Sequence, residues 1–253
     1  MSGKLKRKRL DVLLVECGLA ESRQKAQAMI LAREVEVDGR KAEKSGLSVA
    51  ETARVEVHSR LQKYVSRGGF KLEGALEDFS VSAQGRICLD IGSSTGGFTD
   101  CLLQHGAARV FAVDVNTDQL AWKLHEDARV IRIKKNAREL GPRDLAVSVD
   151  LVVVDVSFIS VRKVLPSACA CAKAGADLLI LIKPQFELER EDVGKGGIVR
   201  DPELHEEAIA CVRRAAEFLG LTNLGVAPSH LPGAEGNQEY FLHARKVAGV
   251  ESQ

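Results

Sequence analysis

The sequence lacks several features that mark specialised classes of protein. No apolar run approaches the roughly 18–20 residues that a membrane-spanning helix needs. The charged start MSGKLKRKRL has no apolar stretch behind it, which argues against a secretory signal. The six cysteines form no Cys-x-x-Cys pair, and several lie in apolar segments. These absences exclude a disulfide scaffold and a structural zinc site, and they predict a cytoplasmic protein with reduced thiols and no bound metal.

The net charge is only +1, but the charge is unevenly distributed along the chain. Residues 1–70 carry 15 Lys and Arg against 9 Asp and Glu, and the rest carries 21 against 26. A small basic part joined to a mildly acidic larger part suggests a polyanion as the partner of the first. A flexible basic tail is the alternative explanation, because five of the cations fall within residues 4–9.

Residues 9–60 have the pattern of a compact α+β unit. A helical apolar face begins at Leu10, Ser22 can cap a second helix, and Val35–Gly39 alternates before a turn, as a strand and hairpin do. The segment RLDVLLVECGLAESRQKAQAMILAREVEVDG resembles the S4 RNA-binding domain in its Arg-Leu-Asp opening, its Ser-Arg-x-x-Ala helix start and its Val-x-Val-Asp-Gly hairpin. Arg33 stands at a helix end where that family often has Gly, and a left-handed backbone there costs a non-glycine residue roughly 1 kcal/mol.

The S4 resemblance implies RNA as the substrate class and divides the chain. We expect an S4-like RNA-binding domain with a basic tail in residues 1–60, a linker in 61–70 and a second domain in 71–253. Cationic side chains are the usual partners of phosphates. We therefore expect RNA contacts from Arg9, Arg23, Lys25 and Arg67.

The second domain is predicted to be an α/β fold. Short β-rich apolar segments alternate with helical stretches, which indicates a mostly parallel sheet with helices on both faces. The expected strands are Ile87–Ile91, Val110–Val115, Val130–Ile133, Leu151–Val156 and Leu178–Ile182. A helix near 203–219 and a terminal antiparallel hairpin, with strands near Val226 and Tyr240–Leu242, complete the pattern. The arrangement resembles the Rossmann-like class I S-adenosylmethionine-dependent methyltransferase fold.

A glycine-rich loop follows the first of these strands and predicts a cofactor site. Ser94 occupies the middle glycine position of the dinucleotide fingerprint, which argues against a pyrophosphate and a nicotinamide cofactor. Asp90 suits a cationic ligand instead, such as a sulfonium with an amino group. The expected cofactor-binding residues of this segment are Asp90, Gly92, Ser93, Ser94, Thr95, Gly96, Gly97 and Phe98.

Two further residues follow the next strands along the chain. Asp114 ends the second strand, where a carboxylate can accept hydrogen bonds from ribose hydroxyls. Asn136 follows the third strand, where an adenine would lie, but it is equally well placed to cap the turn that follows.

Four polar residues are candidates for catalysis. Lys71 lies in the first helix of the second domain, and Glu239 begins the last strand. Asp155 and Lys183 end adjacent strands. Ligands of open α/β sheets bind at the carboxyl ends of the parallel strands, and an antiparallel last strand brings its beginning to the same edge. Each residue alone has an ordinary explanation as a solvated strand end or turn.

Together these four residues are similar to the Lys-Asp-Lys-Glu tetrad of FtsJ-like ribose 2′-O-methyltransferases. With its S4-like part and the motifs SRGGFKLEGAL, DIGSSTGGFTD, DVSFISV, LIKPQFE and GNQEYFL, the chain resembles the TlyA (haemolysin A) family. The resemblance implies methyl transfer from S-adenosylmethionine to a ribose 2′-hydroxyl of ribosomal RNA, typically a cytidine, with the ribosomal subunits as partners. We expect Lys183 to accept the hydroxyl proton or to stabilise the alkoxide. The sequence leaves open which lysine is neutral.

Other interpretations are weaker. An RNA-binding protein without catalysis would not need the four polar residues, and a small-molecule methyltransferase would not need the basic first part. A membrane-active haemolysin is opposed by the lack of a spanning segment. Residues 184–200 contain three glycines and are predicted to form a flap over RNA or cofactor, with a plain surface loop as the alternative.

Overall fold

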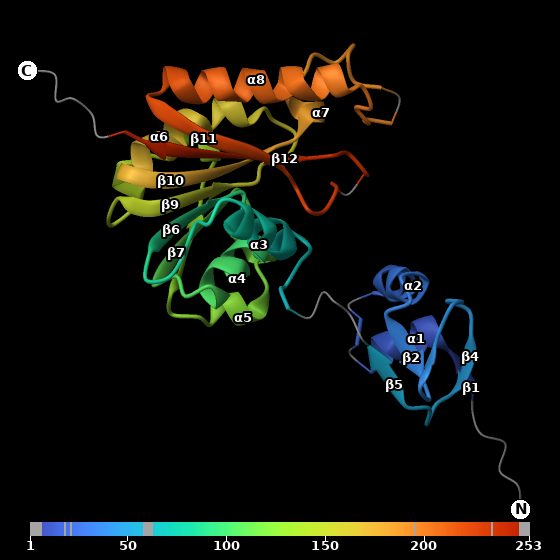
Figure 1. The fold of residues 1–253 in the computed structure, drawn as a ribbon. Coiled ribbons are helices and arrows are strands. Elements are labelled where there is room, and N and C mark those ends of the chain that lie inside the picture. Colours follow the sequence, from blue (N-terminus) through green and yellow to red (C-terminus); the bar gives the residue numbers. More distant parts are fainter. Residues whose placement is uncertain are drawn as a thin grey trace, which may run out of the picture. The chain divides into compact units, whose positions relative to one another are not determined.

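The chain forms two compact units in the computed structural model, residues 1–63 and 64–253 (Figure 1). The structure describes residues 7–17, 19–20, 22–57, 63–194, 196–233 and 235–247. The basic residues Lys4 and Lys6 and the linker residues 61 and 62 of the sequence analysis lie outside these ranges. No helix in the described ranges has the length and apolar character needed to cross a membrane.

The first unit packs two helices against short strands. The helices are α1 (Leu10–Glu16) and α2 (Arg23–Leu31), and the strands are β1 (Arg7–Arg9), β2 (Val35–Val37), β3 (Arg40–Lys41), β4 (Ser48–Ala50) and β5 (Val55–Val57). β1 pairs with β4, and β2 lies between β3 and β5, all antiparallel. The core that holds them together is apolar and includes Leu10, Leu14, Ile30, Val35 and Val49.

Local details of the first unit agree with the sequence. The Ser22 hydroxyl accepts a hydrogen bond from the Lys25 backbone N–H at 3.2 Å, which caps α2 as predicted. Arg33 has a left-handed φ of 58°, as the family pattern implies for the end of α2. The flexible-tail interpretation is wrong for residues 7–9, because these residues form β1 and pair with Ser48–Ala50.

The second unit is built on a seven-stranded sheet in the order β11-β12-β10-β9-β6-β7-β8. Its strands are β6 (Ile87–Ile91), β7 (Arg109–Asp114), β8 (Val130–Lys134), β9 (Val149–Val154), β10 (Ala172–Ile182), β11 (Leu221–Pro228) and β12 (Tyr240–Lys246). The pairs among β6 to β10 are parallel, whereas β12 pairs antiparallel with both β10 and β11. The predicted α/β methyltransferase architecture, with its terminal hairpin, is confirmed.

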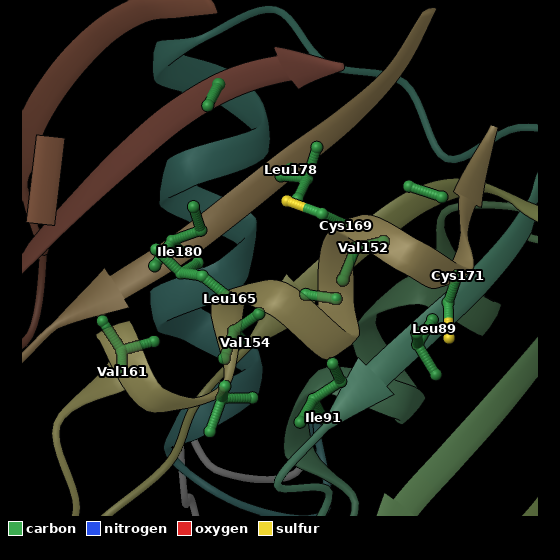
Figure 2. Close-up of a cluster of buried hydrophobic side chains, with 14 of the residues drawn as sticks. Leu89, Ile91, Val152, Val154, Val161, Leu165, Cys169, Cys171, Leu178 and Ile180 are labelled. Atoms are coloured by element: carbon green, nitrogen blue, oxygen red, sulfur yellow. The ribbon is translucent and has the colours of Figure 1, made fainter. Parts of the chain in front are cut away.

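Helices cover both faces of this sheet and create two apolar cores. The helices are α3 (Gly68–Asp78), α4 (Gly97–Gln104), α5 (Trp122–His125), α6 (Leu165–Cys171), α7 (Pro184–Glu187) and α8 (Pro202–Phe218). α6 and α8 pack on one face, where Leu165 and Leu178 belong to the core shown in Figure 2. α3, α4 and α5 pack on the other, through Leu72, Leu102 and Leu124. The alternation of side chains along each strand supplies apolar groups to both cores.

The segment that leads into α3 packs on the second unit. Tyr64 is almost fully buried in the core beneath α3 and α4, and the Val65 backbone N–H donates to Asp100 at 2.8 Å. Residues 64–70, which the sequence assigns to a linker, are therefore held against the helices that carry the glycine-rich loop and Lys71.

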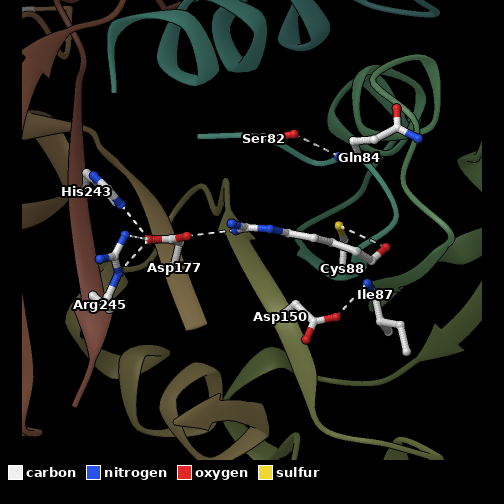
Figure 3. Close-up of polar contacts among 9 residues, drawn as sticks. Ser82, Gln84, Ile87, Cys88, Asp150, Asp177, His243 and Arg245 are labelled. Atoms are coloured by element: carbon white, nitrogen blue, oxygen red, sulfur yellow. Dashed lines mark hydrogen bonds and ion pairs between the residues drawn. The ribbon is translucent and has the colours of Figure 1, made fainter. Parts of the chain in front are cut away.

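A buried carboxylate, Asp177, links three segments of the second unit through hydrogen bonds. Asp177 of β10 accepts hydrogen bonds from His243 at 2.9 Å and from Arg245 at 2.8 Å, both on β12 (Figure 3). It also accepts one from Arg86, which precedes β6, at 2.7 Å. This charge cluster ties together three segments that are distant in the sequence.

Candidate active site

The glycine-rich loop between β6 and α4 requires its glycines. Gly92 and Gly96 have φ values of 88° and 96°, in the left-handed region that favours glycine. A Cβ atom on Gly92 would lie 2.1 Å from the backbone oxygen of Asp155, and one on Gly96 would lie 2.2 Å from Leu124 Cδ1. The loop is therefore pressed against the end of β9 on one side and against α5 on the other.

Two cavities open on this loop, of about 190 Å³ and 370 Å³. Both are lined by Gly92, Ser94 and Asp155, so they meet along the loop. The smaller cavity is also lined by Arg67, Lys71, Ser93, Thr95, Gly97 and Phe98. The larger cavity is also lined by Asp114, Asn136 and Phe158. An elongated ligand that lies along the loop would reach both cavities.

Asp114 and Asn136 both anchor backbone at the larger cavity. Asp114 accepts hydrogen bonds from the Ser94 N–H at 2.9 Å and from the Asn116 N–H at 3.0 Å, which fixes the glycine-rich loop to the end of β7. Asn136 accepts a hydrogen bond from the Arg138 N–H at 3.1 Å, so its capping interpretation is confirmed. Contacts of either side chain with a cofactor stay predictions.

Asp90 lies beneath the loop and lines neither cavity. It is fully buried and accepts a hydrogen bond from the Thr99 hydroxyl of α4 at 2.6 Å. Its other oxygen, Oδ1, has no hydrogen-bond partner among the described residues. Burial raises the pKa of Asp90 to about 7. Its predicted contact with a cationic ligand stays a prediction.

The four candidate catalytic residues form two buried ion pairs. Lys71 Nζ lies 2.5 Å from Glu239 Oε2, and Lys183 Nζ lies 2.5 Å from Asp155 Oδ1. Lys183 also donates to the Ser157 hydroxyl at 2.8 Å. Each lysine is only 8% exposed. Because Lys71 and Asp155 both line the smaller cavity, the two pairs meet there, at the edge where β9 and β10 end and β12 begins.

A further buried carboxylate near the site, Glu187, carried no sequence prediction. It accepts hydrogen bonds from the Ser160 hydroxyl at 2.6 Å, from the Val161 N–H at 2.7 Å and from Arg162 Nε at 3.2 Å. Burial raises its pKa. Glu187 thereby ties the segment after Asp155 to the segment after Lys183. Its place in the LIKPQFE motif was visible, but nothing in the sequence distinguishes it from a surface glutamate.

Two more residues near the site carried no sequence prediction. Asn237 is buried, donates to the Gly197 carbonyl at 2.7 Å and accepts from the Val199 N–H at 2.9 Å. It thus holds part of the predicted flap against the turn that carries Glu239. Phe158 lines the larger cavity with 91% of its surface exposed and a left-handed φ of 65°.

The predicted RNA-binding residues fall in both units. Arg9 and Arg23 each form an ion pair with the buried Asp11, at 3.0 and 3.1 Å, and their side chains remain 52% and 57% exposed. The hydrogen bond from Arg9 is the main reason why the pKa of Asp11 lies well below its usual range. Lys25 is exposed on α2. Arg67 belongs to the second unit, lines the smaller cavity and donates to the Pro232 carbonyl at 3.1 Å.

Comparisons with known proteins agree with this geometry. A family model of FtsJ-like methyltransferases matches residues 64–246, and a model of the S4 domain matches residues 8–55. The 16S/23S rRNA (cytidine-2′-O)-methyltransferase TlyA of Mycobacterium tuberculosis is 48% identical, over 95% of this chain and 90% of the relative. Hemolysin A of Brachyspira hyodysenteriae is 44% identical, over 93% and 98%. A solved structure from Streptococcus thermophilus, described as a hemolysin, has a TM-score of 0.77 and 38% identity over 97% and 90% of the two chains.

The chain belongs to the FtsJ-like methyltransferases and, among them, to the TlyA family, in which an S4 domain precedes the methyltransferase domain. Its cofactor is S-adenosylmethionine, as the sequence predicts. The residues around the loop fit this molecule, because the glycines allow close approach of the backbone and the two adjoining cavities can accept its two ends.

Proposed function

We propose that this protein methylates the 2′-hydroxyl of a cytidine ribose in ribosomal RNA, with Lys71, Asp155, Lys183 and Glu239 as its catalytic residues. The observation that carries the proposal is the meeting of two buried lysine–carboxylate pairs at a cavity that shares its wall with the glycine-rich loop. The cytidine and the ribosomal RNA come from the name of the tuberculosis relative.

The reaction mainly requires that the two reactants are positioned and that one proton is removed. When bound, S-adenosylmethionine supplies an electrophilic methyl group. Held at the glycine-rich loop, this sulfonium would give up the methyl group to the ribose oxygen and remain as a thioether, and the hydroxyl proton would pass to a base of this chain. We assign that base to Lys183 Nζ, which Asp155 and Ser157 hold in place. Lys183 must be neutral when it accepts the proton.

The second ion pair, between Lys71 and Glu239, would position the substrate rather than react with it. Glu239 fixes the Lys71 ammonium at the wall of the cavity, where its charge can stabilise the developing alkoxide and orient the ribose. Gly233 lies so close to Glu239 that an added Cβ would be 2.6 Å from Oε1, so the loop before β12 packs tightly around this carboxylate.

The first unit would bind the substrate. Arg9 and Arg23 keep about half of their side-chain surface exposed while Asp11 orients them, and Lys25 lies on the same helix as Arg23. Guanidinium groups held in this way suit phosphates. We extend the proposal to assembled ribosomal subunits as substrates and to the cytoplasm as the location, because that is where ribosomes are found.

One experiment tests the proposal directly. The protein is incubated with methyl-labelled S-adenosylmethionine and with each unmethylated ribosomal subunit, and the label is mapped to a nucleotide and to base or ribose. Lys183→Ala serves as the matched control. We expect label on a ribose 2′-oxygen with the wild type and at least about 10²-fold less with the variant. If the protein binds RNA but labels neither subunit, it is an RNA-binding protein without this catalytic activity.

A further inference from the structure

We infer that Trp122, His125 and Arg132 form a second RNA contact on the methyltransferase unit, a platform on which an unpaired nucleobase stacks. The inference deepens the proposed function and rests on RNA being the substrate. None of the three residues lines either cavity described above.

The platform is an exposed aromatic face that its neighbours hold in place. Trp122 is the only tryptophan of the chain, and it is 75% exposed. Its ring lies nearly parallel to that of His125, with the centroids 6.2 Å apart and an interplanar angle of 15°. His125 in turn bonds to Arg132 of the edge strand β8, with Arg132 Nη1 2.8 Å from His125 Nδ1.

The guanidinium of Arg132 brings a positive charge to the edge of the stack. Arginine has only donors, so His125 Nδ1 accepts this hydrogen bond. Arg132 is exposed, and it forms no ion pair within the part of the chain that the structure describes. The nearby Lys123 and Lys134, by contrast, are paired with Asp100 and Asp118.

A nucleobase is the partner that this chemistry fits. Aromatic faces and arginine guanidinium groups bind single-stranded RNA by stacking, and an exposed guanidinium beside the ring can also bind a phosphate. An indole is normally costly to leave so exposed to water, whereas stacking on a base would bury it.

The position of the platform connects it to the active site. The backbone N–H of Ala121, which precedes Trp122, donates to the Thr95 carbonyl in the glycine-rich loop at 3.1 Å. Leu124, on the same short helix, packs against Gly96 of that loop. Figure 1 shows this helix, α5, beside α4, which the loop opens. A base held on Trp122 would therefore lie on an element bound directly to the cofactor loop.

Because Trp122 is the only tryptophan, its fluorescence reports this surface alone. The full chain is titrated with a 12-nucleotide oligocytidylate while emission is followed on excitation at 295 nm. Steady-state methylation of ribosomal subunits is then measured for the wild type and for Trp122→Ala, Trp122→Phe and Arg132→Gln. Phe218→Ala is the matched control, because Phe218 is a 91% exposed aromatic on α8, which packs on the other face of the sheet.

We expect the oligonucleotide to quench the emission. Trp122→Ala should raise the KM for subunits at least about 5-fold, the lower range for loss of one stacked base. Trp122→Phe should restore most of that loss because it keeps an aromatic face. Arg132→Gln should weaken binding, and Phe218→Ala should stay within 2-fold of the wild type. Affinity for S-adenosylhomocysteine, measured by calorimetry, should be the same in all variants, which shows that the loop is intact.

The outcomes separate this inference from the proposed function. Unquenched emission at saturating oligonucleotide, or a wild-type KM in Trp122→Ala, would show that Trp122 does not stack on a base. Methylation by the wild type would at the same time support the proposed function. Quenching by RNA in a protein that methylates neither subunit would uphold the platform and contradict the proposed function.

Discussion

Replacement of Asp90 by asparagine should change how the stability of the methyltransferase unit depends on pH. Burial raises the pKa of Asp90 from its usual 3.8 to about 7. The folded state therefore keeps a proton that the unfolded chain has already lost. Where the folded state binds more protons, the free energy of unfolding falls as pH rises. This loss begins near pH 4 and ends above pH 7, once Asp90 is ionised in both states.

The size of the effect follows from the pKa difference. At 1.36 kcal/mol per pKa unit, Asp90 contributes a loss of about 4 kcal/mol in total, of which about 2.5 kcal/mol falls between pH 5 and pH 8. An asparagine in its place would not titrate, and the amide carbonyl oxygen could still accept the hydrogen bond from Thr99. The variant should therefore gain about 2.5 kcal/mol relative to the wild type between these two pH values.

Urea unfolding without cofactor, followed by far-ultraviolet circular dichroism at pH 5, 6, 7 and 8, measures this difference. Asp118→Asn is the control, because that carboxylate is 76% exposed and the pH dependence should then match the wild type. Comparing variant with wild type at each pH cancels the contributions of other titrating groups. Parallel curves for the wild type and Asp90→Asn over this range would refute the reasoning, since Asp90 would then not titrate where its burial requires.

Three further predictions concern activity. Lys183→Ala should lower the single-turnover methylation rate at least about 10²-fold, and Lys183→Arg should fail nearly as badly because arginine does not give up its proton near neutral pH; a near-normal rate for arginine would leave charge stabilisation as the role of Lys183. Asp114→Ala should weaken S-adenosylmethionine binding by about 10- to 100-fold in calorimetry, because it removes an acceptor and the anchor of Ser94, and unchanged affinity would contradict its placement. Removal of residues 1–63 should abolish subunit methylation, measured with labelled donor, while the affinity for the cofactor is unchanged. Full activity of the shortened chain would show that the first unit is not needed to bind the substrate.

The strands and the glycine-rich loop were predictable because their physics is local. A strand buried on both faces needs a continuous apolar run, so β6, β7, β9 and the Leu178–Ile182 part of β10 stand out in the sequence. A left-handed turn pressed against a neighbour needs glycine, so Gly92 stands out as well. Asp155 and Lys183 were located by the same logic, as polar residues directly after such runs. The strand order then brings them side by side.

The features that escaped prediction depend on distant partners. The Arg-Lys-Arg of β1 has no strand pattern of its own and becomes a strand by pairing with Ser48–Ala50. Glu187 is buried because Ser160 and Val161 fold back onto it, which its own surroundings in the sequence do not indicate. Tyr64 belongs to a core because α3 and α4 close over it.

The pairing of Lys71 with Glu239 also has a consequence for the folding of the chain during its synthesis. The two residues are 168 positions apart, and the second lies at the beginning of the last strand. Synthesis runs from the N-terminus, so a growing chain can complete the first unit long before Glu239 has left the ribosome. Such a chain cannot yet form the Lys71–Glu239 ion pair, so this contact is completed only near the end of synthesis.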